Sequence, residues 1–316
     1  MYKKLLAIPV TAVFLLLAAC GAGSGGQTAD GSPAAKPTRS IQYLGTAYKI
    51  PARTKQIAFV DSRSSFEDSL LLGIPPFAAT VEKSGAFPQE YASITQNTQK
   101  LPADIAERID DLKALYPDTI LTSDKTPAEK RATLEKAASV IPISSNGAHW
   151  EDNLRLLAEV RGKDANVDAI VSKVRTNIEN TREKLAPLKD KKVLAVWFRE
   201  GAFVVSPKNE RYNYLLYTDL GLATPDVVEQ AKEPVSLTLE QLAQTDPDYL
   251  FVMVDKSSDP GAEAAFEQLQ QKSEWSNLHV TKDGRVYVNA VNPGLAGGTA
   301  YSNQSFMNAI SARMLK

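Results

Sequence analysis

Short apolar runs alternate with longer amphipathic stretches along the chain from residue 41 onward. In the first half the apolar runs are residues 57–60, 119–122 and 140–143, and helical spacing of apolar side chains fills the stretches between them. A buried strand followed by an amphipathic helix, repeated several times, is typical of α/β units around a largely parallel sheet. The pattern therefore predicts an α/β lobe over residues 41–163.

The same alternation restarts after Lys192 and predicts a second α/β lobe over residues 188–316. The apolar runs of this half are residues 193–198, 214–222, 249–254 and 285–290. Two stretches of the first half also recur in the second, in the same order. Residues 68–76 correspond to 217–225, and residues 109–118 correspond to 239–248, where a helix ends in a Pro-Asp turn that leads into a strand. Two such correspondences indicate two related lobes that arose by duplication.

One long helix is predicted between the lobes, over residues 164–187. Val167, Val171, Val174 and Ile178 follow helical spacing, and the stretch contains no glycine before Pro187 ends it. Such a helix would span roughly 35 Å, about the width of a small domain. The expected fold is therefore α/β, with two Rossmann-like lobes joined by one long helix and a ligand cleft between the lobes.

The first twenty residues have the pattern of an export signal. Lys3 and Lys4 precede an apolar stretch, and small residues stand directly before Cys20, the only cysteine of the sequence. We expect residues 1–19 to be a signal peptide, and residues 20–40, rich in Gly, Ser, Ala and Pro, to be a flexible tether. This box resembles the bacterial lipoprotein signal, which implies that Cys20 is acylated and anchors the chain to the outside of a membrane.

Composition and charge exclude several classes of function. Without residues 1–19 the chain keeps 297 residues with 34 basic and 37 acidic side chains, a balance that gives no reason to expect a nucleic-acid partner. The only histidines are His149 and His279, and the sequence contains no Walker loop, GxSxG or HExxH motif. We therefore expect a binding protein and not an enzyme.

The chain resembles the lipoprotein substrate-binding components of iron–siderophore ABC importers. The resemblance rests on the Leu-Ala-Ala-Cys box, the two α/β blocks joined by a helix, YTDLGL in residues 217–222 and VYVNAVNPGLAGGTAYS at 286–302. Through SFEDSLLLGIPP, SGAFP, HWEDNLRLLAE and GGTAYS it is most similar to the catecholate-siderophore binders of Gram-positive bacilli.

The resemblance implies a monomeric, lipid-anchored protein on the extracellular face of the membrane. It would capture a ferric siderophore and deliver it to permease subunits that work with a separate ATPase. No cofactor is expected, and no direct metal site, because the chelator already surrounds the iron with oxygen atoms.

A bulky anionic ligand needs basic and aromatic side chains at the rim of the two lobes. Arg199 is the strongest candidate, because it follows an apolar strand at the carboxyl end, where α/β sheets bind ligands, and it matches an arginine that such binders use. The other candidate ligand contacts are Arg63, Lys83, Lys100, Trp197, Lys208, Arg211, Tyr212, Lys232 and Tyr301.

The sequence departs from the family pattern at two places. Ala86 and Trp197 stand where catecholate binders carry basic residues, so two alternatives remain, a mixed or hydroxamate siderophore of lower charge and a catecholate held by Lys83 and Lys100 instead. A haem or corrinoid receptor of the same fold is a further alternative, with Tyr212, Tyr301 or Met253 as axial ligand of a haem. An exported siderophore esterase, which would need a Ser–His pair, and a purely structural lipoprotein are the others.

Two acidic residues occupy equivalent places in the two lobes. The resemblance implies that Asp110 and Glu240 pair with arginines of the membrane permease. The alternative is that both are solvated acids near helix N-termini, where they suit the helix dipole.

Overall fold

The computed structural model describes residues 37–82, 84–162 and 166–315. The predicted signal peptide, Cys20 and Lys83 lie outside these residues. Within them, we find no helix with both the length and the apolar character needed to cross a membrane.

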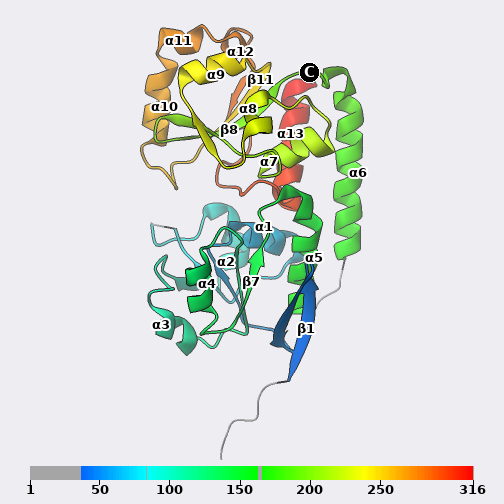
Figure 1. The fold of residues 1–316 in the computed structure, drawn as a ribbon, viewed down its shortest axis with the longest axis vertical. Coiled ribbons are helices and arrows are strands. Elements are labelled where there is room, and N and C mark those ends of the chain that lie inside the picture. The colour runs from blue at the N-terminus through cyan, green and yellow to red at the C-terminus, as the bar shows by residue number, and fades with distance from the viewer. Residues whose placement is uncertain (1–36, 83, 163–165, 316) are drawn as a thin grey trace, which may run out of the picture. The chain divides into compact units, whose positions relative to one another are not determined.

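The first lobe is built on a five-stranded parallel sheet (Figure 1). The strand order is β5-β4-β3-β6-β7, and the strands are β3 (Ile57–Val60), β4 (Ala78–Thr80), β5 (Gln99–Leu101), β6 (Thr119–Ser123) and β7 (Ser139–Ile143). Its helices are α1 (Arg63–Leu72), α2 (Ala92–Thr95), α3 (Ile109–Ala114), α4 (Ala128–Leu134) and α5 (Trp150–Arg161). Gly73 ends α1 in the left-handed conformation with φ 61°, as its position after the apolar helix suggests.

An antiparallel hairpin that the sequence analysis did not anticipate precedes this sheet. Strands β1 (Thr38–Tyr43) and β2 (Thr46–Pro51) are joined by Leu44 and Gly45, whose φ values of 46° and 80° fit a two-residue hairpin turn. Ile41 and Ile50 are fully buried, so one face of the hairpin belongs to the core of the first lobe. Residues 38–40, which we expected in the tether, therefore belong to β1.

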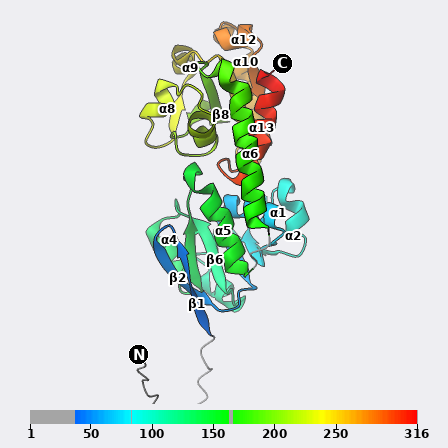
Figure 2. The same ribbon diagram turned by 90° about the vertical axis from the view of Figure 1, so that its right-hand side faces the viewer.

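Helix α6 (Val167–Leu185) follows the first lobe and packs against α5 and against α13 (Ala300–Met314), as Figures 1 and 2 show. A 3-10 turn at Ala186–Leu188 ends it at the predicted proline. Its buried residues are Val167, Val171, Val174, Ile178, Thr181 and Leu185, which form the apolar stripe that its sequence spacing predicts.

The second lobe contains a mixed five-stranded sheet in the order β10-β9-β8-β11-β12. Its strands are β8 (Val193–Arg199), β9 (Ala202–Val205), β10 (Val235–Leu237), β11 (Tyr249–Val254) and β12 (Val286–Val288). β8, β11 and β12 are parallel, whereas β9 runs antiparallel to both β8 and β10. Its helices before α13 are α7 (Tyr212–Tyr214), α8 (Asp226–Gln230), α9 (Leu239–Thr245), α10 (Ala262–Gln270), α11 (Ser273–Ser276) and α12 (His279–Lys282).

The apolar run 214–222 contains no strand, and its residues 214–219 are helical. α7 continues into a π-helical turn at Leu215–Asp219, in which Leu215, Leu216 and Tyr217 are all buried. Three consecutive buried residues, with the exposed Thr218 directly after them, leave no clear helical period in the sequence.

The prediction of an α/β fold with two sheet-containing lobes is confirmed. The lobes share part of their cores. Trp150, Leu154 and Ala158 of α5 belong to the same apolar cluster as α6, α13 and the sheet of the second lobe. Two further clusters lie on the two faces of the first sheet.

Candidate functional site

A cavity of about 300 Å³ is lined by residues of both lobes. The first lobe contributes the segments that follow the carboxyl ends of β3, β6 and β7, among them Arg63, Lys125 and Ser144. The second lobe contributes Arg199 and Arg211 together with the loop before α13. The site therefore lies where α/β sheets bind ligands.

Four cationic side chains line this cavity, and two of them are paired with carboxylates. Lys125 Nζ lies 2.7 Å from Glu210 Oε1 of the opposite lobe. Arg63 Nη2 lies 2.9 Å from Glu82 Oε1. Arg199 and Arg211 make no salt bridge with any carboxylate among the residues that the structure describes. In the described part of the chain, these two arginines thus line the cavity without a carboxylate counter-ion.

Arg199 is the last residue of β8, and a tight turn follows it. Glu200 and Gly201 have φ values of 50° and 78°, which is the two-residue turn that suits the twist of a hairpin. The turn returns the chain as β9, where Ala202 pairs with Arg199. The Nε of Arg199 is buried and has no hydrogen-bond partner among the described residues. A ligand oxygen in the cavity would supply the missing acceptor.

Arg211 is held by an aromatic ring and a backbone carbonyl. Its guanidinium lies 4.3 Å from the ring centroid of Trp197, and its Nη1 donates to Ala296 O at 3.0 Å. The residue keeps some exposure to the cavity, whereas protein atoms surround its charged end on most sides. This burial, together with the smaller effect of the nearby charge of Arg199, lowers the pKa of Arg211 to about 10. An anion close to Arg211 would favour its charged form and raise this pKa again.

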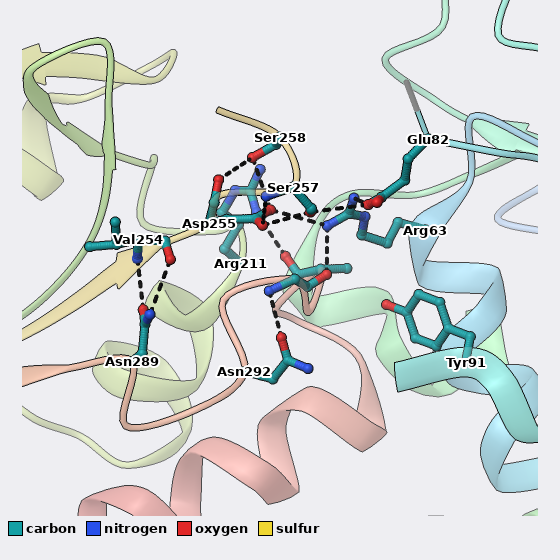
Figure 3. Close-up of polar contacts among 12 residues, drawn as sticks. Arg63, Glu82, Tyr91, Arg211, Val254, Asp255, Ser257, Ser258, Asn289 and Asn292 are labelled. Atoms are coloured by element: carbon teal, nitrogen blue, oxygen red, sulfur yellow. Dashed lines mark hydrogen bonds and ion pairs between the residues drawn. The ribbon is translucent and has the colours of Figure 1, made fainter. Parts of the chain in front are cut away.

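The loop of residues 289–299, which we call the crossover loop, connects β12 with α13 and touches both lobes. At its start, Asn289 Oδ1 accepts from Val254 N at 2.8 Å and its Nδ2 donates to Val254 O at 3.1 Å (Figure 3). Near its end, Gly297 and Gly298 lie against Arg211, and a Cβ on Gly298 would be 3.0 Å from Arg211 O. Both glycines have positive φ, so the close approach and the backbone conformation each require glycine there.

Arg63 connects the first lobe with the crossover loop and with Asp255, the residue after β11. Its Nη1 donates to Gly294 O at 2.6 Å and lies 3.7 Å from Asp255 Oδ2. Ser257 Oγ donates to Glu82 Oε1 at 3.2 Å, so Glu82 also contacts both lobes (Figure 3). The resulting network of Arg63, Glu82, Asp255 and Ser257 closes the cavity on one side.

A second cavity of about 560 Å³ lies beyond this network and has the opposite charge. Its lining includes Glu82, Glu90, Asp255 and Glu263, and among the described residues Lys256 is its one basic side chain. The two described cavity-lining arginines without a carboxylate partner, Arg199 and Arg211, thus lie at the first cavity.

Of the ten predicted ligand contacts, the structure brings Arg63, Arg199 and Arg211 together in the cavity. Lys83 lies outside the described residues. The others do not line the cavity. Lys100 is exposed and donates to Gly85 O at 3.0 Å, Lys208 pairs with Glu229 at 2.8 Å, Lys232 is exposed, and Tyr301 is half-buried in the first turn of α13.

Trp197 and Tyr212, which we expected to form aromatic walls, are buried next to the cavity and do not line it in this structure. Trp197 is 3% exposed and Tyr212 is fully buried, and their rings stack at 5.7 Å with an interplanar angle of 6°. Arg211 covers the Trp197 ring and Phe306 packs on Tyr212, so neither ring faces the cavity. The Trp197 ring contacts the Arg211 guanidinium, and Tyr212 stacks on Trp197.

Sequence reasoning missed Lys125, Ser144, Asn153 and the residues of the crossover loop that line the cavity. Lys125 follows the carboxyl end of β6, so the argument that singled out Arg199 could also have found it. The Gly297-Gly298 pair was a signal for a close backbone approach. Nothing local in the sequence marks Asn153, which lies within α5 and donates to Ser144 O at 3.0 Å.

Ser144 and His149 form the only serine–histidine hydrogen bond among the described residues, at 2.9 Å between Oγ and Nδ1. Ser144 Oγ also accepts from Asn146 N at 3.2 Å, and no described carboxylate pairs with the His149 ring. Met253 is 1% exposed and lies outside the cavity, as does Tyr212. Among the described residues no group of three or more His, Cys, Asp or Glu side chains could hold a metal ion.

The two predicted docking acids lie on equivalent helices. Asp110 is in the first turn of α3 and Glu240 is in the first turn of α9, and both are exposed. A hydrogen bond from Lys113 lowers the pKa of Asp110, and one from Thr238 lowers the pKa of Glu240. Each lobe therefore presents an ionised carboxylate to solvent at neutral pH.

Comparison with known proteins gives a consistent family. A family model described as periplasmic binding protein matches residues 59–290. The chain is 31% identical over 312 residues to the iron-uptake system-binding protein of Bacillus subtilis (strain 168). This alignment covers 97% of this chain and 98% of that relative.

Two solved structures from the same organism have a similar fold. One is the triscatecholate siderophore binding protein FeuA of Bacillus subtilis complexed with ferri-bacillibactin, with a TM-score of 0.83 and 31% identity over 87% of this chain and 98% of that chain. The other is the petrobactin-binding protein YclQ, with a TM-score of 0.73 and 19% identity over 89% of this chain and 100% of that chain. At that identity the second supports the fold alone.

Proposed function

Because the chain belongs to the periplasmic binding protein family, we propose that it is the substrate-binding component of an ABC importer and captures a ferric siderophore in the cavity between its lobes. The similar structure that holds ferri-bacillibactin, a triscatecholate, supports this ligand class for the present chain. A catecholate is the favoured ligand, and a mixed or hydroxamate siderophore is the alternative.

One observation carries the proposal: Arg199 and Arg211 face the cavity without a carboxylate partner among the described residues. A charge removed from water is costly unless it is paired. An anionic ligand would supply that pair, and guanidinium groups hydrogen-bond well to the paired oxygens of a catecholate. Arg63 adds a third cation at the edge of the same cavity.

The test is a tryptophan-fluorescence titration of the soluble chain without residues 1–20. The probes are ferri-bacillibactin, a ferric hydroxamate, ferric citrate, haem and cobalamin. We expect saturable binding of one ferric siderophore, and at least tenfold weaker binding in Arg199→Ala, which corresponds to about 1.4 kcal/mol. Lys232→Ala, an exposed cation outside the cavity, is the matched control and should bind like the unsubstituted chain. Binding of haem or cobalamin alone would replace the proposed cargo.

We further propose that a lipid on Cys20 holds the protein, a monomer, on the extracellular face of the membrane. Asp110 and Glu240 would dock it on permease subunits that work with a separate ATPase. Their exposure and their equivalent places on α3 and α9 support this role.

The docking proposal predicts that Asp110→Ala and Glu240→Ala each reduce siderophore-dependent iron uptake in cells, while siderophore affinity in vitro stays unchanged. Glu183→Ala, which removes an exposed acid of α6, is the control. Uptake equal to that of the control in both docking variants would contradict the proposal.

We propose no catalytic activity for the chain. The contacts of Ser144 and His149 support a structural hydrogen bond, since Ser144 Oγ is shared with Asn146 N and the ring lacks a described carboxylate partner. Hydrolysis of a siderophore ester that Ser144→Ala abolishes would contradict this and favour the esterase alternative.

A further inference from the structure

We infer that Glu67, a fully buried residue of α1, is a positioning residue for the ligand cavity. Its carboxylate fixes the crossover loop in the conformation that orients Arg211, and it acts together with Arg63 on the same helix. The part of this inference that concerns affinity rests on the proposed function, whereas the part that concerns the loop does not.

Glu67 accepts three hydrogen bonds. Ala296 N donates to its Oε1 at 2.5 Å and Tyr91 OH to the same atom at 3.1 Å, while Thr299 Oγ1 donates to its Oε2 at 2.5 Å. Two of these donors belong to the crossover loop. Thr299 is also the N-cap of α13, so Glu67 fixes both the last part of the loop and the start of the helix that follows.

Arg63 and Glu67 hold the same loop from one face of one helix. They are four residues apart on α1, which places their side chains on neighbouring turns. Arg63 donates to the carbonyl of Gly294, and Glu67 accepts from the amide of Ala296. The first lobe is thus hydrogen-bonded to the loop at two positions, Gly294 and Ala296.

Ala296 connects Glu67 with Arg211 through two hydrogen bonds. Its amide donates to Glu67, and its carbonyl accepts from Arg211 Nη1 at 3.0 Å. The next two residues, Gly297 and Gly298, lie in close contact with the Arg211 backbone, which is itself in an unusual conformation with φ 51°. A shift of Ala296 would therefore move both the guanidinium and the backbone of Arg211.

A carboxylate in this place is costly for the fold. Glu67 is 0% exposed, and burial raises the pKa of its carboxyl even though Thr299 and Ala296 donate to it. An apolar side chain would avoid the cost of desolvation, but it would leave the amide of Ala296 and the hydroxyl of Tyr91 without their acceptor. Glu67 is thus better explained by the loop geometry that it sets than by a gain in stability.

The experiment uses three variants. Glu67→Met keeps the length of the side chain and removes every acceptor. Glu67→Gln is the conservative variant, because its amide oxygen can still accept from Ala296 N. Asp68→Asn is the matched control, since Asp68 is the neighbouring buried carboxyl of α1 and makes no described hydrogen bond to the crossover loop. If Glu67→Met does not fold, Glu67→Asp, which withdraws the carboxylate by one methylene, gives the same test.

The first readout is hydrogen exchange of peptides from residues 289–299 without ligand. We expect exchange at least tenfold faster in Glu67→Met than in the unsubstituted chain, with little change in Asp68→Asn. The second readout is the affinity for ferri-bacillibactin. We expect at least a tenfold loss in Glu67→Met, recovery of most of this loss in Glu67→Gln, and a much smaller effect of Glu67→Met when Arg211→Lys is already present.

Unchanged exchange in the loop of Glu67→Met would overturn the inference, whether or not the chain binds a siderophore. It would also be overturned if Asp68→Asn lost as much affinity as Glu67→Met, or if the losses from Glu67→Met and Arg211→Lys simply added. If the unsubstituted chain binds no siderophore, the proposed function fails, and faster exchange in the loop still supports the role of Glu67 in placing it.

Discussion

Single residues in unusual backbone conformations gather around the cavity. Asp61, Glu200, Arg211 and Asn289 all have positive φ without being glycine, and each lies at the cavity, at the turn after Arg199 or in the crossover loop. Such conformations cost of order 1 kcal/mol or more and persist where the surrounding structure enforces them. For Arg211 the strained backbone places the guanidinium over Trp197, next to Arg199.

Tyr116 has a similar conformation far from the cavity and allows a stability prediction. Its φ is 52° and it is 76% exposed, so few contacts compensate for the strain of a bulky residue there. We expect Tyr116→Gly to raise the free energy of unfolding by up to about 1 kcal/mol. Glycine relieves the backbone strain at positive φ, and its greater conformational freedom in the unfolded chain offsets part of this gain. Urea unfolding at pH 7.5 measures it.

Ligand affinity should be unchanged in this variant. A lower free energy of unfolding in Tyr116→Gly would mean that the aromatic ring contributes contacts that outweigh the strain.

The residue scale also shows what sequence could and could not predict about the site. Arg199 was predictable because a charged residue directly after a buried apolar strand marks the binding edge of an α/β sheet. Trp197 shares a face of β8 with Arg199 and was expected to share its exposure. Its ring is covered by Tyr212 and Arg211, which are more than ten residues away in sequence, and no local pattern reports such tertiary contacts.

At the scale of elements, the π-helical turn Leu215–Asp219 contains a partly buried acid. Asp219 Oδ2 is buried without a hydrogen-bond partner among the described residues, and burial raises the pKa of this carboxyl to about 6. Arg182 of α6 donates through its Nε to the backbone carbonyl of Asp219 at 2.7 Å. The turn is thus attached to α6 by its backbone, while its side chain carries an unfavourable charge at neutral pH.

The raised pKa of Asp219 predicts a dependence of stability on pH. The folded state binds more protons than the unfolded state between about pH 4 and pH 6, because an unfolded Asp titrates near pH 3.9. The free energy of unfolding should therefore fall as pH rises through this window. Asp219→Asn carries no charge at this position, so its free energy of unfolding does not fall in this window. At pH 7.5 it should be more stable than the unsubstituted chain by about 1 to 2 kcal/mol, which is less than the full free-energy equivalent of the pKa shift because Asp219 is partly exposed to solvent.

Urea unfolding of both chains at pH 4 and pH 7.5 provides the measurement. Most of the gain from Asp219→Asn should be lost at pH 4, where the carboxyl is neutral in the folded state and about half protonated in the unfolded state. An equal gain at both pH values would show that the effect comes from packing and not from charge.

The elements differ in how clearly their sequences predict them. Helix α6 was predictable because one face is buried and the other is solvated, so its valines recur with a helical period. The segment 214–222 and the hairpin β1–β2 were not assigned. The first is buried on several sides, and the second has only a few apolar positions, of which Ile41 and Ile50 are fully buried. A periodic sequence pattern reveals a helix or strand only where one face of the element is buried and the opposite face is exposed.

At the scale of the whole molecule, one apolar core contains residues of both lobes. The largest cluster joins Trp150 and Leu154 of α5 with α6, α13 and the sheet of the second lobe. Polar contacts add to it on the other side of the cavity, where Lys125 pairs with Glu210 and Gly147 N donates to Asn209 O at 2.7 Å. A shared core of this kind favours a largely pre-formed cavity. Ligand binding then needs little free energy to bring the lobes together.

A shared core predicts that the two lobes unfold together. Leu154 is fully buried in the cluster that spans both lobes, so Leu154→Ala should cost about 2 to 5 kcal/mol and lower the unfolding midpoint of both sheets equally. Leu134→Ala is the matched control, because Leu134 is equally buried but lies in a cluster of the first lobe alone. Hydrogen exchange of peptides from β6 and β8 across a urea series reports the two sheets separately.

In coupled lobes even Leu134→Ala shifts the midpoints of β6 and β8 by the same amount, because neither sheet persists without the other. A siderophore at a hundred times its dissociation constant should likewise stabilise both peptides together, by about 2.7 kcal/mol. Two separate midpoints, with Leu134→Ala acting on β6 alone, would mean that the lobes are independent units. The cavity would then have to be assembled by the ligand, and the arginines that line it could not be held in place before the siderophore arrives.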